Sequence, residues 1–115
     1  MEIRDFSMTA GDTKIIDVAV TEQSDGSPTV ITDATISWKA SRSLRTTAAI
    51  SKTTSSGISI TSGSGGTFRI TLTAANTDSL RGDYYHEAQI TFSDNEVATV
   101  LKGIMTIEPA LITAS

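Results

Sequence analysis

Few residues of this 115-residue chain could do chemistry, and the first candidate is its single histidine. His86 has Asp78 and Asp83 near it in the sequence, and with a serine they could form a Ser-His-Asp set, in which the histidine accepts the hydroxyl proton. No Gly-X-Ser-X-Gly elbow is present, and His86 lies between Tyr84 and Ala88 on the apolar face of an alternating segment. This phase favours a structural histidine, so we expect no enzyme and no catalytic residue.

Metal and phosphate sites have little support in the sequence. One histidine and no cysteine argue against zinc. The segment TSGSGG at 61–66 lacks the Lys-Ser or Lys-Thr ending of a phosphate loop and predicts a flexible hairpin loop. Calcium stays an alternative because aspartate oxygens could bind it, but no run matches an EF-hand loop, and loop aspartates commonly form turns. We therefore expect no cofactor and no metal; the loop aspartates are Asp12, Asp25, Asp33, Asp78, Asp83 and Asp94.

The element that must position His86 is a strand over residues 84–93. Its residues alternate between an apolar and a polar face, the period of a half-buried strand. The apolar face holds Tyr84, His86, Ala88, Ile90 and Phe92, and the polar face Tyr85, Glu87, Gln89, Thr91 and Ser93.

Similar alternation predicts the remaining strands. The only tryptophan, Trp38, falls on an apolar face and is predicted to fill the core. A helical turn is predicted after Thr73, and Thr73 would be its cap. In the last strand, apolar residues fall at both odd and even positions, so a single regular strand could not direct all of them to one face. This predicts a bulge at Gly103. The expected strands cover 2–8, 14–21, 34–41, 48–52, 58–60, 67–73 and 97–107.

The connections are predicted as turns and loops. Residues 23–29 form a loop, and residues 93–96 form a tight hairpin turn. Residues 43–49 form either a helical turn or a crossover. The segment after Pro109 is either a frayed tail or a segment that docks on a neighbour.

Together these elements predict one domain over residues 1–115. It is all-β, an Ig-like Greek-key β-sandwich of about seven to eight antiparallel strands. The segment 78–84 is similar to the tyrosine corner of such sandwiches, in which the hydroxyl of Tyr84 would bond to the backbone just upstream and Gly82 would take a positive φ.

Composition excludes several classes of protein. The net charge is −4 and basic residues are few and scattered, so no nucleic-acid partner is expected. The absence of cysteine excludes a disulfide-type extracellular Ig domain. No apolar run predicts a signal peptide or a membrane span, so we expect synthesis in the cytoplasm and no membrane partner.

The order of motifs resembles a known family. It runs Gly11-Asp12-Thr13, an Asp-Gly-Ser-Pro loop at 25–28, DATISW at 33–38, GTFRITLT at 66–73, AANTDSLRGDYYHEAQIT at 74–91 and TVLKGIMTIEPAL at 99–111. This resembles the small Ig-like domains of tailed bacteriophages and prophages, found in baseplate, tail-fibre-adaptor and head–tail proteins. The resemblance implies a non-enzymatic virion structural protein that assembles with other virion proteins, forms a homo-oligomer and resides in the virion. Trp38, Gly82 and Tyr84 match it as fold positions only.

Two other functions remain open. A module that binds carbohydrate or a host surface would present outward aromatic side chains, and Tyr85 is the one convincing candidate. A hydrolase would rest on His86 and the nearby acids alone. A small-molecule ligand is not expected.

Overall fold

The computed structural model describes residues 2–21, 29–43 and 48–109. Most of the predicted 23–29 loop, the centre of the 43–49 segment and the tail beyond Pro109 lie outside the described residues. So does Asp25, one of the candidate calcium ligands.

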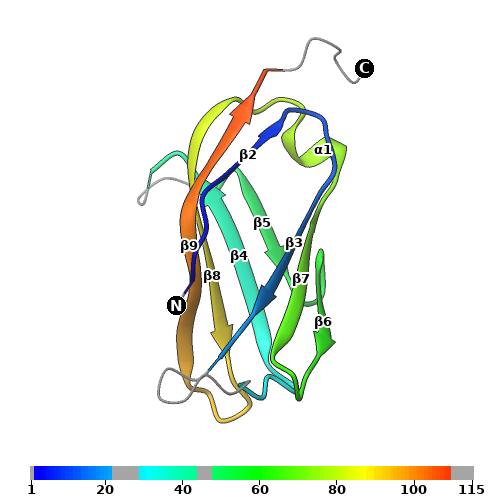
Figure 1. Ribbon diagram of the computed structural model, residues 1–115, viewed down its shortest axis with the longest axis vertical. Coiled ribbons are helices and arrows are strands. Elements are labelled where there is room, and N and C mark those ends of the chain that lie inside the picture. The colour runs from blue at the N-terminus through cyan, green and yellow to red at the C-terminus, as the bar shows by residue number, and fades with distance from the viewer. Residues whose placement is uncertain (1, 22–28, 44–47, 110–115) are drawn as a thin grey trace.

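The described residues form two sheets that pack face to face as a β-sandwich, confirming the predicted all-β fold class (Figure 1). Sheet A has the strand order β1-β9-β8-β4-β5, with β2 also pairing with β9, and sheet B has the order β3-β7-β6. The elements are β1(Glu2–Ile3), β2(Phe6–Thr9), β3(Lys14–Ala19), β4(Thr35–Ser41), β5(Ile50–Thr53), β6(Ile58–Ser62), β7(Thr67–Leu72), α1(Ala74–Thr77), β8(Gly82–Thr91) and β9(Val97–Glu108).

The alternation of each strand directs one set of side chains into a single core between the sheets. Trp38 on β4 is fully buried, which confirms its predicted place, and it pairs with the buried Ala88 of β8. Sheet B contributes the facing layer. The largest fully buried hydrophobic side chains are Trp38, Phe68, Ile31, Ile36, Ile70, Leu72, Ile90, Leu101, Met105 and Ile107.

The N-terminal strands differ from the prediction in number and direction. Residues 2–8 were expected as one strand of an antiparallel fold, but β1 and β2 are separate and both run parallel to β9. The same register continues across the break, because the Arg4 amide donates to the Lys102 carbonyl at 2.8 Å. At the break the Arg4 carbonyl is directed towards the buried His86 ring of β8.

The predicted bulge in the last strand is real but lies elsewhere. Ala88 pairs with Leu101 while the next residue, Gln89, pairs with Thr99. Val100 is therefore the extra residue, and the consecutive side chains Val100 and Leu101 are both buried. The prediction of a bulge at Gly103 was wrong, because the change of parity occurs at Val100–Leu101.

The turns on either side of β8 agree with those predicted from the sequence. Thr73 precedes α1, and its amide donates to the Asn76 Oδ1 at 2.8 Å, which closes the first turn. Gly82 has a φ of 95°, the positive value expected there, and Asn95 in the predicted hairpin turn has a φ of 72°.

The predicted tyrosine corner is not formed in the part of the chain that the structure describes. Among these residues, no hydrogen bond joins the Tyr84 hydroxyl to the preceding turn. Instead the Arg42 guanidinium lies 4.8 Å from the centre of the buried Tyr84 ring and donates through Nη2 to the Arg81 carbonyl. Arg42 thus supplies the donor to this turn in place of the tyrosine hydroxyl.

Candidate functional site

His86 is buried on the inner face of β8 and both of its ring nitrogens have partners. The Trp38 Nε1 lies 3.2 Å from the His86 Nδ1, and the His86 Nε2 lies 2.7 Å from the Arg4 carbonyl oxygen. Indole N–H can only donate, so Nδ1 accepts and the proton of the neutral ring is on Nε2, which donates to Arg4. His86 is therefore a fully hydrogen-bonded histidine of the core, as its phase predicted.

The close approach of the Arg4 carbonyl to His86 depends on Gly103. Gly103 pairs with His86 across the β8–β9 ladder. A Cβ at Gly103 would lie 1.9 Å from the Arg4 carbonyl oxygen and 2.8 Å from the His86 Nε2. Only glycine leaves room here, so its role is steric.

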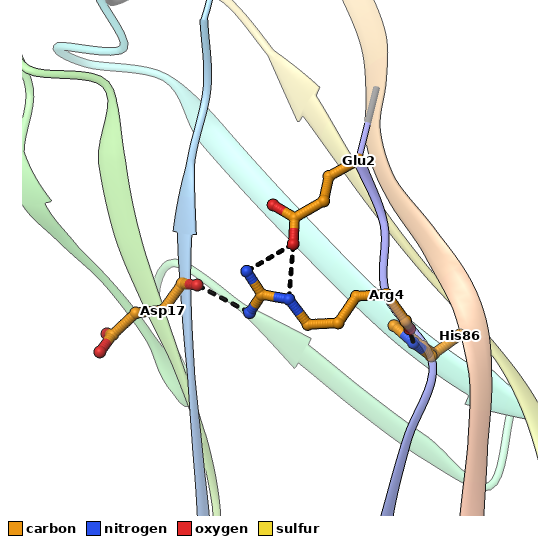
Figure 2. A network of polar contacts seen from close by, with 4 residues as sticks. All are labelled: Glu2, Arg4, Asp17 and His86. Carbon is orange, nitrogen blue, oxygen red and sulfur yellow. Dashed lines mark hydrogen bonds and ion pairs between the residues drawn. The ribbon is translucent and has the colours of Figure 1, made fainter.

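The Arg4 side chain joins the two sheets (Figure 2). Its Nε and Nη2 contact the Glu2 Oε2 at 2.6 and 2.5 Å, and its Nη1 donates to the Asp17 carbonyl of β3 at 2.7 Å. The same residue thus bonds to His86 through its backbone and to the edge of sheet B through its guanidinium. This network closes the side of the sandwich between β1 and β3.

The surroundings of His86 disfavour its charged form. The Phe6 ring meets it edge-on with centroids 5.3 Å apart, and the Trp38 ring lies at 5.9 Å. Burial lowers the pKa of His86 below its ordinary value, and the bond to the Arg4 carbonyl and the nearby Asp5 carboxylate oppose this only in part. The ring is neutral at physiological pH.

The described residues do not form the Ser-His-Asp set that the sequence left open. Asp83 lies on the outer face of β8, opposite in phase to His86, and accepts a hydrogen bond from the Thr106 hydroxyl at 2.8 Å. Asp78 is exposed at the end of α1. Since Trp38 and Arg4 occupy both ring nitrogens, His86 has no free nitrogen to activate a nucleophile.

The residues of the other candidate sites also make their contacts within the chain. The described residues contain no group of three or more acidic or histidine side chains that could hold a metal ion. Asp94 accepts from the Glu96 amide at 3.0 Å, as a turn former does. In the TSGSGG segment the carbonyls of Gly63 and Gly66 accept from Ile31 and Val20, so this loop is fixed to its neighbours.

One open surface of the described residues is the outer face of sheet A. There the exposed side chains of Ile3, Tyr85 and Ile104 come from β1, β8 and β9, and Tyr85 and Ile104 are directly paired across the ladder. A hollow of about 670 Å³ opens on this face. Its lining also includes Asp5, Lys39, Ser41, Ala48, His86, Glu87, Lys102 and Gly103.

The sequence predicted one of the three large apolar residues that line this hollow, which are Ile3, Tyr85 and Ile104. Tyr85 was expected to point outward and is 46% exposed. Ile104 was missed because its orientation depends on the bulge, and placing the bulge at Val100 rather than Gly103 would have settled it. Ile3 was missed because two-residue β1 is too short to show a period.

Comparisons with known proteins add no relative: no protein-family model matches the chain, and no curated protein matches it. No helix among the described residues is long and apolar enough to cross a membrane. The outer face of sheet A, rather than His86, is the candidate functional site.

Proposed function

We propose that this chain is a non-enzymatic structural protein that acts by protein–protein assembly through the outer face of sheet A. One observation carries the proposal: Tyr85, Ile104 and Ile3 are exposed together on a face that the fold itself does not cover. Exposed apolar side chains gathered on one face and bordered by charged residues are typical of interaction surfaces.

The kind of assembly we propose is a virion part of a tailed phage or prophage. Its support is the order of motifs along the chain and the single all-β domain, in which His86 and Asp83, two of the potential catalytic groups, are hydrogen-bonded within the fold. The partners would be other virion proteins, together with further copies of this chain.

The virion assignment is tested by fractionating particles from a culture that expresses the chain from its native gene. A density gradient separates assembled particles from free protein, and an antibody against the chain locates it. We expect the chain to sediment with particles. Finding it only among free proteins, in a culture that produces particles, would contradict the virion assignment.

A second candidate is a carbohydrate-binding module on the same face. Tyr85 lies in a hollow that also offers the polar groups of Asp5, Lys39 and Glu87, the combination of aromatic surface and hydrogen-bonding groups that sugars require. A glycan array distinguishes the two functions. Binding that is lost in Tyr85→Ala would favour the carbohydrate module, and an array without binding would exclude it.

A further inference from the structure

We propose that the partner docked on the outer face of sheet A is a second copy of this chain, related by a two-fold axis that runs along the β8–β9 ladder. This inference rests on the proposed assembly function and specifies its partner. It follows from the pattern of side chains across the two central strands.

Three outward cross-strand pairs of this ladder join complementary residues. Tyr85 faces Ile104, an aromatic beside an aliphatic residue. Glu87 faces Lys102, with 3.5 Å between Oε1 and Nζ. Two residues from Tyr85 in the other direction, Asp83 accepts from the Thr106 hydroxyl.

This pairing makes the face complementary to itself. A two-fold axis between β8 and β9, parallel to the strands, places each β8 residue of one copy opposite the β9 residue of the same row in the other copy. Glu87 then faces the Lys102 of the second copy, and Tyr85 faces its Ile104. Neither of these rows brings like charges together.

The charges around the apolar centre agree with a self-contact. Lys39 and Lys102 are offset by Glu87 and Asp5, so the lining of the hollow carries no net charge: two positive and two negative side chains. A face of one sign would repel a second copy. The hollow gives room for the partner's Tyr85 and Ile104 side chains.

The size of the face predicts a weak dimer. Five paired strands span about 19 Å at a spacing of about 4.8 Å, and the 10 residues of β8 extend about 34 Å, which gives an upper limit of roughly 600 Å² per copy. Specific interfaces bury about 800 Å² per partner, so this contact falls at the weak end of the range. We expect a dimer that dissociates on dilution.

Sheet B supplies the matched control. Its outer face also has an exposed isoleucine, Ile15, and a cross-strand ion pair between Asp17 and Arg69 at 2.8 Å. It has no exposed aromatic residue among the described side chains of β3, β6 and β7. A change at Ile15 therefore tests general surface effects without touching the proposed contact.

The decisive experiment uses two charge variants, Glu87→Lys and Lys102→Glu, in sedimentation velocity over roughly 1 µM to 1 mM. Each variant alone places like charges across the two-fold axis, and we expect its dimer to be roughly tenfold weaker than that of the wild-type chain.

An equimolar mixture of the two variants restores the opposite charges. The lysine introduced at position 87 of one chain meets the glutamate introduced at position 102 of the other, and the unchanged Lys102 of the first chain meets the unchanged Glu87 of the second. We expect the mixture to form the heterodimer with affinity restored to near the wild-type value.

The possible outcomes test this inference separately from the proposed assembly function. Restored association in the mixture supports the two-fold contact, because rearranging the ion pair inside one chain cannot produce it. A wild-type chain that stays monomeric throughout the range overturns the self-contact, whereas the particle fractionation tests the assembly function independently. If neither charge variant weakens association, so that both behave as we expect of the Ile15→Lys control, the self-contact lies on another surface. That result would also overturn the inference.

Discussion

The two faces of β8 carry similar side chains, but the fold covers only those of the inner face. On the inner face, Tyr84 is covered by Arg42 and His86 is bonded by Trp38 and Arg4. On the outer face, Tyr85 is 46% exposed. On this strand the side chains capable of chemistry are therefore bonded or covered within the fold, and the exposed aromatic residue lies on the face that we propose for assembly.

The largest difference between the faces should appear when an aromatic residue is removed from each. Trp38→Ala opens a cavity in the core and leaves the His86 Nδ1 without its donor, so it should lower the free energy of unfolding by about 3–5 kcal/mol. Tyr85→Ala should change it by no more than about 0.5 kcal/mol. Urea denaturation of both variants checks this. Equal losses for the two variants would contradict the assignment of the faces.

Substitution of Gly103 tests whether the close approach of the Arg4 carbonyl to His86 requires glycine at this position. Gly103→Ala introduces a Cβ that would lie 1.9 Å from that oxygen, so β1 and β2 must move away from β9. We expect a loss of about 1–3 kcal/mol in the free energy of unfolding. Amide hydrogen exchange should also show faster exchange in residues 4–9. Ile104→Ala, one residue along the strand, is the control and should leave exchange in this segment unchanged.

The inner face should also be sensitive to acid, through His86. Its pKa is lowered in the folded chain, so the unfolded chain binds more protons below its ordinary pKa of about 6.5. The contribution of neutral His86 to stability is thus fully present above about pH 6.5 and is lost as the pH falls below it. A protonated Nδ1 would also face the Trp38 N–H without an acceptor.

The measurement is the urea midpoint at about pH 7.5 and about pH 5.5, on either side of the ordinary histidine pKa. The wild-type midpoint should fall between these values by more than that of His86→Gln, which does not titrate at this position. An equal fall in the two proteins would show that His86 does not cause the acid sensitivity.

The smallest effect on stability, with the clearest effect on association, is expected on the outer face. Ile104→Lys should leave the free energy of unfolding within about 0.5 kcal/mol and weaken self-association roughly tenfold. Ile15→Lys on sheet B should change neither. Sedimentation velocity and urea denaturation of the pair provide the comparison, and equal association by the two variants would exclude Ile104 from the contact.

The sequence predicted features that depend on local alternation and failed where the fold depends on distant contacts. The apolar phase of β8 and the burial of Trp38 follow from period two alone. The bulge at Val100 is a backbone feature that residue type did not mark, and it decides that Ile104 faces outward. Likewise, one of the two partners of His86 is a backbone carbonyl 82 residues away, which no local pattern can reveal.

The proposal that the outer face of sheet A is a surface for assembly can be tested by the mass of the wild-type chain in solution. Light scattering on a size-exclusion column, from roughly 1 µM to 1 mM, spans the range in which a weak dimer forms. We expect the mass to rise from the monomer value of 12.1 kDa towards twice that value. A mass of 12.1 kDa at every concentration would contradict self-assembly through this face.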